Sequence, residues 1–296
     1  MKTANVEEEY KKNDQLKADD VKSLKEWMEK QPHLPKITDL EIILFLNCTF
    51  YSLERAKTVI DTYYSCRTYC PEFFDARDPN GAIVKELDVV LFYHLPETTL
   101  QNHEVVYTCL KDKDPANFRF TEILKIFSMY VDVRLLQKGT APGHQIILDL
   151  DNLVFGHLSK LSIMAIKKFM YYLQEALPVR LTGVHVINVV PFIDKLMFLV
   201  KPFMKKELLD VLIFHTDGLE SLYKYVPKKS LPKHLGGEAA TVPEMEDLMK
   251  KELQNNREYF MEEQKNRVDE AKRPGKAKNA GDLFGTEGSF KKLDID

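Results

Sequence analysis

The sequence lacks a large excess of charge of either sign. Its 42 Lys and Arg residues oppose 45 Asp and Glu residues, which leaves a formal net charge of −3. A protein that binds nucleic acid through its phosphates shows a strong basic excess, because those contacts dominate the affinity. We therefore expect no nucleic acid among the partners of this chain.

Cysteine is scarce as well, with four residues among 296. A disulfide framework is typical of short, cysteine-dense secreted chains. Cys66 and Cys70 would share a helix face, but no further Cys or His lies close in sequence to complete the three or four ligands of a metal site. The first residues, MKTANVEEEYKK, contain no apolar stretch like that of a secretory signal. These absences predict a cytoplasmic protein with packing cysteines and no metal.

Motifs that carry catalysis are missing too. The sequence contains no GxxxxGK phosphate loop and no pair of histidines four residues apart. Asp149 and Asp151 alternate at the end of an apolar run and could imitate a pair of catalytic carboxylates, but no nucleophile or acid accompanies them. The sequence therefore predicts no catalytic residues and no cofactor, and we do not expect an enzyme.

One apolar segment stands out, VHVINVVPFIDKLMFLVKPFM at residues 184–204, in which fourteen of twenty-one residues are large and apolar. It does not suit a membrane span, because Asp194 and Lys195 lie at its centre and each central charge costs about 2.5–3.5 kcal/mol. Pro191 divides it. The pattern predicts a buried strand before this proline and a helix after it.

The predicted helix at residues 192–204 has two apolar faces. One face holds Ile193, Leu196, Met197, Val200 and Met204. A second group lies largely off that face and consists of Phe192, Phe198, Leu199 and Phe203. A helix that is apolar nearly all round is either buried on every side or has two apolar neighbours. It is therefore either a core helix or a lid, with one face over an apolar cavity and the other available to a membrane.

Basic residues flank this helix. Residues 195–233 contain eight lysines and four acidic residues. Three of these lysines could touch an anionic lipid surface, namely Lys201, Lys205 and Lys206. A solvated polar face explains them equally well.

The pattern along the chain predicts four segments. Residues 1–82 are a helical module, residues 83–240 a domain of strands and helices, residues 241–273 a C-terminal helix and residues 274–296 a disordered tail rich in glycine and charge. In the first segment we expect three helices, which begin near Asp19 or Asp20, at a capping box formed by Thr38 and Glu41, and after Ser52.

Five short apolar runs follow the helical module and have the composition of β-strands. They are LDVVLFYHL, HEVVYTCL, HQIILDLD, GVHVINVV and DVLIFHT. Helical stretches separate several of them, and one of these stretches runs to Gly139, a residue suited to end a helix. Strands that alternate with helices predict an α/β domain with a mixed, largely parallel sheet covered by helices.

The order of these segments resembles the CRAL-TRIO family of lipophilic-ligand transfer proteins, and within it the insect-type relatives of the tocopherol-transfer branch. The motifs that carry the resemblance are Asp149-Leu150, Pro178, His185-Val186-Ile187-Asn188, Lys201-Pro202-Phe203 and Leu231-Pro232 with Gly236-Gly237. The stretch FLNCTFYSLERAK resembles the helical N-terminal module of that family. The positions where the branch carries basic residues for phosphoinositide head groups hold Thr182, Glu207 and Val211, which departs from the pattern.

The resemblance implies that residues 83–240 form a lipid-binding domain. The protein would then be a carrier that holds a small hydrophobic ligand in a buried apolar pocket under a mobile lid and exchanges it at membranes. Tocopherol, retinoid, carotenoid, sterol and phospholipid all remain open as the ligand. We expect a monomer that contacts membranes transiently. The alternative is the same fold with a vestigial pocket, serving as an interaction scaffold or regulator.

Strand and helix directions predict which residues line the pocket. Beside the inner face of the lid, these wall residues are Phe127, Tyr130, Ile146, Leu148, Met170, Leu173, Leu177, Val184 and Val186. The resemblance adds Tyr172, which matches a wall position of the family.

Overall fold

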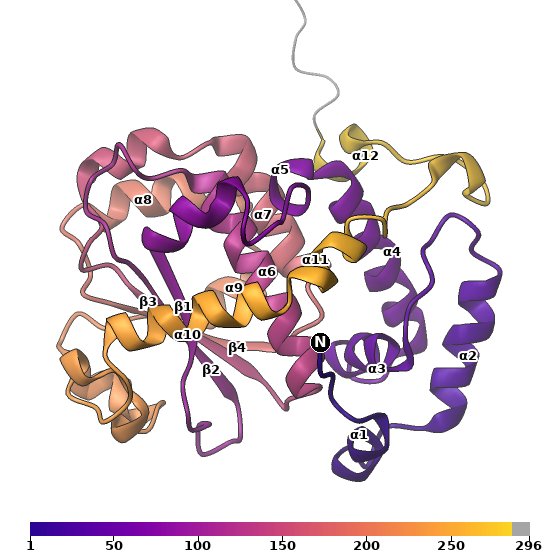
Figure 1. Cartoon of the computed structure of the whole chain (residues 1–296), viewed down its shortest axis with the longest axis horizontal. Coiled ribbons are helices and arrows are strands. Elements are labelled where there is room, and N and C mark those ends of the chain that lie inside the picture. The colour runs from indigo at the N-terminus through magenta and orange to yellow at the C-terminus, as the bar shows by residue number, and fades with distance from the viewer. Residues whose placement is uncertain (286–296) are drawn as a thin grey trace, which may run out of the picture.

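The computed structural model describes residues 1–285, in which a helical region lies beside a region built on a five-stranded sheet (Figure 1). The strands are β1 (Val90–His94), β2 (Glu104–Leu110), β3 (His144–Asp149), β4 (Leu181–Ile187) and β5 (Leu212–Phe214). The helices that connect the strands are α6 (Phe120–Lys138), α7 (Ile163–Glu175), α8 (Ile193–Val200) and α9 (Lys206–Asp210). This architecture confirms the predicted α/β class.

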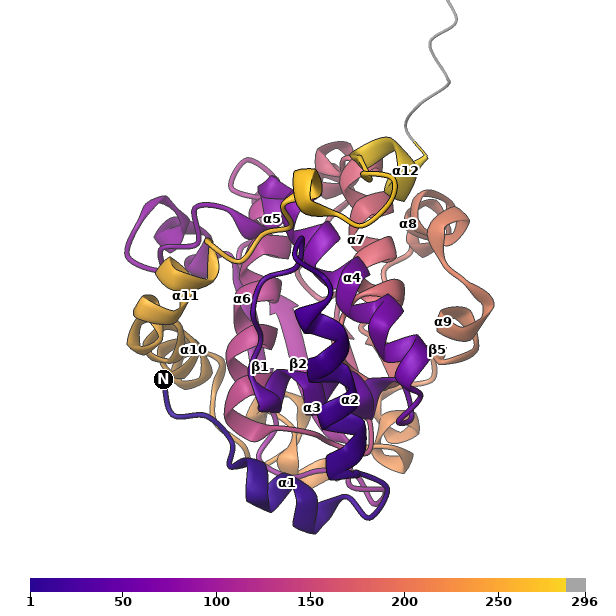
Figure 2. The same ribbon diagram turned by 90° about the vertical axis from the view of Figure 1, so that its right-hand side faces the viewer.

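The N-terminal region contains more helices than the sequence predicted. They are α1 (Val6–Lys12), α2 (Ala18–Glu29), α3 (Asp39–Cys48), α4 (Leu53–Tyr69) and α5 (Pro71–Phe74). The capping box at the start of α3 is present, since the Thr38 hydroxyl accepts the backbone N–H of Glu41 at 3.3 Å. The helix α1 was missed because its apolar content is low, although Asn5 caps it. Figure 2 shows α2, α3 and α4 together at the front of this view.

The sheet has the sequential order β1-β2-β3-β4-β5, with β1 and β2 antiparallel and all later neighbours parallel. Parallel neighbours need a crossover, and such crossovers are right-handed in nearly all proteins. When strands follow one another in sequence, right-handed crossovers place every connecting helix on the same face. The helices α6, α7 and α8 therefore lie on one side of the sheet.

Short 3-10 helices cover the opposite face. The relevant ones are η4 (Leu219–Lys224), η5 (Lys228–Ser230) and η6 (Lys233–Leu235). The hydroxyl of Tyr107 in β2 lies 3.1 Å from Nε2 of His234 in η6, and the ring of His185 in β4 packs 4.8 Å from that of Tyr225. These strand residues alternate with those that face α6 to α8, so the sheet is covered on both sides. The remaining 3-10 helices are η1 (Ala82–Asp88), η2 (Phe155–Lys160), η3 (Lys201–Phe203) and η7 (Glu270–Lys272).

The C-terminal part differs from its prediction. The single helix expected over residues 241–273 is divided into α10 (Val242–Asn255) and α11 (Arg257–Glu263), because the chain bends at Asn256. The helix α10 covers the free edge of β1, where the Phe92 N–H donates to the sulfur of Met249 at 3.3 Å.

The expected tail at residues 274–296 needs a correction as well. Residues 280–284 form α12 (Ala280–Phe284), in which Phe284 is buried and packs 5.4 Å from the ring of Tyr171. Tail composition alone did not show that one phenylalanine anchors this segment. Residues 286–296, the rest of the predicted tail, lie outside the described residues. The segment boundaries near residues 82 and 240 stay predictions.

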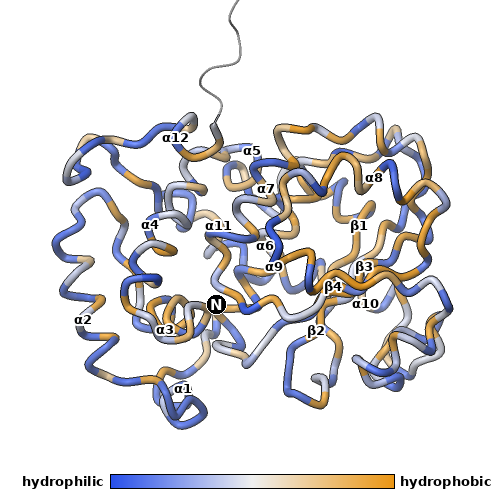
Figure 3. Tube along the Cα trace, turned by 180° about the vertical axis from the view of Figure 1, so that it is seen from behind, coloured by the Kyte–Doolittle hydropathy of each residue, from blue (hydrophilic) through white to orange (hydrophobic). Residues whose placement is uncertain are grey.

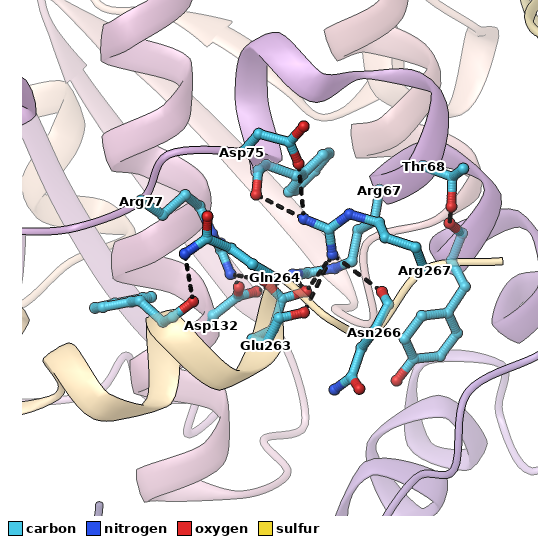
Figure 4. A network of polar contacts seen from close by, with 12 residues as sticks. Arg67, Thr68, Asp75, Arg77, Asp132, Glu263, Gln264, Asn266 and Arg267 are labelled. Carbon is cyan, nitrogen blue, oxygen red and sulfur yellow. Dashed lines mark hydrogen bonds and ion pairs between the residues drawn. The ribbon is translucent and has the colours of Figure 1, made fainter.

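Four buried charged side chains join the N-terminal helices, the sheet region and the C-terminal segment (Figure 4). Arg67 in α4 binds Asp132 in α6 and Glu263 in α11, each at 2.5 Å. Arg77 binds Asp132 at 2.7 Å and also pairs with Glu263. Buried ion pairs are stable only when every charge is matched, and this closed ring meets that condition.

Candidate ligand-binding site

A cavity of about 330 Å³ lies between the sheet and the helices α6, α7 and α8. Its floor is made by alternate residues of neighbouring strands. Ile146 of β3 is paired with Val184 of β4, and Leu148 with Val186, so the four side chains form one apolar block. Hydrophobic colour is concentrated along β3 and β4 (Figure 3). The size is at the lower end of the roughly 300–1,000 Å³ typical of small-molecule pockets.

Most of the predicted wall residues lie around this cavity. They are Phe127, Ile146, Leu148, Met170, Leu173, Val184, Val186, Ile193, Leu196, Met197, Val200 and Met204. Leu177 lines a smaller, adjoining cavity instead. That these residues contact a ligand stays a prediction.

Tyr130 and Tyr172 are not on the cavity wall. The hydroxyl of Tyr130 accepts the backbone N–H of His94 at 2.8 Å, on the side of α6 that meets β1. Tyr172 is 1% exposed, and its ring packs 5.1 Å from Phe74. In a helix, a residue two positions after Met170 points about 200° away from it, so Tyr172 faces the N-terminal helices. The prediction was wrong for both tyrosines.

The sequence analysis missed a further set of wall residues. It includes Val90 and Phe92 of β1, Val106 and Thr108 of β2, Phe118, Phe120 and Ile123 near the start of α6, and Leu212 and Phe214 of β5. Strand alternation would have found those on β1, β2 and β5, because they share a face with Ile146. Nothing in the local pattern marks Phe118.

The helix α8 closes one side of the cavity. None of its residues is buried, which excludes a core helix surrounded on every side. Its predicted inner face lines the cavity, whereas Phe198 is 79% exposed. Phe192 is half-buried, with its ring 5.5 Å from that of the exposed Phe155. Leu199 and Phe203, the other predicted outer residues, are half-buried.

Gln174 at the end of α7 holds the segment that follows α8. Its Nε2 donates to the carbonyl oxygen of Phe203 at 3.0 Å, and its Oε1 accepts the backbone N–H of Lys205 at 2.6 Å. The Lys205 ammonium also forms an ion pair with Glu175. Lys206 pairs with Asp210 at 2.5 Å, and Lys201 is exposed. The Gln174 side chain thus binds the backbone on both sides of Met204.

A second cavity of about 150 Å³ adjoins the first. The two share four wall residues, which are Val106, Phe127, Ile146 and Leu173. The second cavity differs in chemistry, because its wall also contains polar and charged side chains. These are Lys12, His94, Glu104, Arg134, Lys138, Thr140 and His144.

The carboxylate of Asp149 is fully occupied by hydrogen bonds. It accepts from the hydroxyl of Tyr107 at 2.7 Å, from Nδ2 of Asn188 at 2.8 Å and from the backbone N–H of Asp151 at 3.1 Å. Burial works against ionisation, but these hydrogen bonds and one from His234 hold the pKa of Asp149 below its ordinary value. Such a carboxylate ties strand ends together and does not pair with Asp151 for catalysis.

Two further findings concern residues 1–285 alone. No cluster of three or more His, Cys, Asp or Glu side chains in this part of the chain could hold a metal ion. Within the same residues, every helix is too short or too polar to cross a membrane. The four cysteines are free thiols.

Known proteins resemble this chain in both of its regions. Residues 13–84 match the family described as Pinta-like, UBA domain, and residues 91–237 match the CRAL/TRIO domain. Proteins named alpha-tocopherol transfer protein-like from Homo sapiens and Pongo abelii are each 27% identical over 237 residues, which cover 78% of this chain and 68% of the relative. Clavesin-1 from Rattus norvegicus is 30% identical over 125 residues, 42% of this chain and 35% of that protein.

Proposed function

Because residues 91–237 of this chain are a CRAL/TRIO domain, we propose that the protein is a carrier of a small hydrophobic lipid. The lipid occupies the cavity between the sheet and α8, and the protein exchanges it at membranes without chemical change. The carrier works in the cytoplasm as a monomer and touches membranes only transiently. The observation that carries this proposal is the cavity itself, whose walls are almost entirely aliphatic and aromatic.

Apolar burial supplies the driving force for uptake. Each Å² of apolar ligand surface removed from water contributes about 25 cal/mol. The wall offers few polar groups, Thr108, Asp149 and His157 among them. Asp149 is already saturated by hydrogen bonds, so it adds little to recognition. The large cavity therefore selects hydrocarbon by shape and size.

In this proposal α8 is the lid. It has Pro191 before it and Pro202 in the turn after it, and its inner side chains cover the cavity. The segment packs on α7 mainly through half-buried side chains, and Gln174 forms two hydrogen bonds with its backbone, at Phe203 and Lys205. Opening requires these two bonds to break, after which the outer apolar residues can enter a bilayer.

Replacing Gln174 with Met should weaken the closed lid. The variant keeps a similar volume but loses both hydrogen bonds, each of which contributes about 0.5–1.5 kcal/mol. We expect ligand to leave for excess vesicles about five- to tenfold faster, measured by stopped-flow fluorescence. Gln137→Met on α6 is the matched control. An unchanged exit rate would show that Gln174 does not hold the lid.

The membrane-facing role of the lid is tested by Phe198→Ser. A phenylalanine side chain contributes about 1.5–3 kcal/mol when it is fully buried. Losing that contact should slow transfer between vesicles tenfold or more, by the conversion of about 1.4 kcal/mol per factor of ten. The equilibrium affinity for the ligand should change less than about twofold on this account, because Phe198 lies outside the cavity.

Phe50→Ser serves as the control, since Phe50 is also exposed but lies in the N-terminal region. Normal stability with undiminished transfer by Phe198→Ser would reject membrane insertion of α8. If the unaltered protein transfers no lipid at all and carries none, the fold serves instead as an interaction scaffold.

A further inference from the structure

The second cavity has the features of a binding site for a polar head group. It shares four wall side chains with the apolar cavity, so the two spaces lie next to each other. A ligand that filled both would place its hydrocarbon against the large cavity. Its other end would meet the charged and polar side chains of the small one.

Arg134 on this wall forms no ion pair with the residues that the structure describes, and its guanidinium is partly buried, unlike the exposed Lys138. Arg67, Arg77 and Arg273 each bind carboxylates of the protein. Arg134 is half-buried, and its Nε is buried without a hydrogen-bond partner among residues 1–285. A guanidinium taken partly out of water needs an anion, and a carboxylate fits its planar donor set in a bidentate manner.

Two histidines lie on the same wall and offer hydrogen bonds. Nδ1 of His144 is buried and has no partner within the described part of the chain. Burial lowers the pKa of His144 to about 4, with His103 as a smaller cause, so its ring is neutral near pH 7. Burial likewise holds the pKa of His94 well below its ordinary value, and Arg134 contributes to this shift.

The contacts of His94 with Tyr130 favour one tautomer. The hydroxyl of Tyr130 accepts the backbone N–H of His94 at 2.8 Å and lies 3.2 Å from Nδ1 of the same residue. When that hydroxyl donates its own proton to Nδ1, the neutral ring carries its proton on Nε2. His94 then presents a donor, as an acceptor-rich head group requires.

The other charged wall residues are compatible with one added negative charge. Lys12 is already engaged, since it pairs with Glu9 at 2.7 Å and donates to the carbonyl oxygen of Thr140 at 2.8 Å. Lys138 is exposed, and Glu104 is the acid among the described wall residues. One unpaired guanidinium and two neutral rings suit a monoanion better than a phosphate dianion.

We propose that the ligand is a long-chain carboxylate, whose carboxyl group binds Arg134, His144 and His94 while its chain fills the apolar cavity. This inference rests on the proposed carrier function and specifies its ligand class. It selects a fatty or isoprenoid acid over a neutral alcohol, sterol or phospholipid.

The test compares two probes with the same chain, cis-parinaric acid and its methyl ester, whose fluorescence rises on burial. The full-length protein should bind the acid at least tenfold more tightly than the ester. Arg134→Gln should lower the affinity for the acid tenfold or more and change the affinity for the ester less than twofold. Arg134→Lys, which keeps the charge without the planar fork, should retain part of the preference.

Lys251→Gln on α10 removes one positive charge from an exposed site and is the matched control, which should leave both affinities unchanged. Should Arg134→Gln fail to fold, His144→Phe provides the second variant and should reduce the preference for the acid. Equal binding of acid and ester by the unaltered protein, or an unchanged ratio in these variants, overturns the carboxylate inference and leaves the carrier function standing. Failure to bind either probe would instead reject the carrier function.

Discussion

Leu148→Trp should reduce the affinity for a hydrophobic ligand at least a hundredfold. Leu148 lies at the centre of the cavity floor, paired with Thr108 of β2 on one side and Val186 of β4 on the other. An indole at this position occupies the space that the ligand needs. A hundredfold loss corresponds to about 2.7 kcal/mol by the usual conversion, roughly the free energy of burying one large apolar side chain.

The fold should survive this substitution because the added volume enters a space rather than a packed core. Overpacking can still cost about 1–3 kcal/mol of stability. Titration with a hydrophobic fluorophore, paired with a thermal melt, measures both effects. Leu100→Trp is the control, since Leu100 is 90% exposed on the loop between β1 and β2. A cooperative melt with unchanged affinity would remove Leu148 from the ligand site, and Val184→Trp would then repeat the test on β4.

Glu263→Gln should lower the free energy of unfolding by about 3–5 kcal/mol, the range for breaking a buried ion pair from one side. Glu263 binds Arg67 and Arg77 in the buried ring, and its loss leaves two guanidinium groups to share Asp132. Urea unfolding measures the loss. Glu262→Gln is the control, because Glu262 is exposed and pairs with Lys265 at the surface, a contact that contributes about 0–1 kcal/mol.

The contribution of Glu263 should also depend on pH. Burial alone would raise the pKa of Glu263, but Arg67, Arg77 and Arg267 hold it down at about 2. The unfolded chain has a glutamate pKa of about 4.3. A depressed folded pKa stabilises the protein above the unfolded value, and this stability is lost as the pH falls from about 4.3 towards 2. The difference between the unaltered protein and Glu263→Gln should therefore shrink in that window; a constant difference would contradict this assignment of charge.

Local patterns were sufficient wherever an element has one apolar face. Alternation along β3 placed Ile146 and Leu148 on the cavity side, and helical spacing placed Ile193 and Leu196 beneath α8. These predictions succeed because side-chain direction repeats every two residues in a strand and every 3.6 in a helix. The motif order then identified the domain family, which the match at residues 91–237 confirms.

Such local patterns could not predict contacts between segments that are distant in the sequence. Arg67 binds Glu263, which lies 196 residues later in the sequence. The local sequence around each of them looks like that of an ordinary charged residue exposed to solvent. The second cavity was missed for the same reason, since His94, Arg134 and His144 come from β1, α6 and β3. Tyr172 is a different case, because it follows Met170 by two residues on α7 and therefore points about 200° away from the cavity side of that helix.

Native mass spectrometry of the purified full-length protein tests the carrier proposal most directly. We expect a mass above that of the polypeptide by one small amphiphile per chain, released by organic solvent and absent from Leu148→Trp. The contrary result is a folded protein that shows only the polypeptide mass and takes up neither cis-parinaric acid nor its methyl ester from solution. That result would mean that the cavity behind α8 does not hold a lipid.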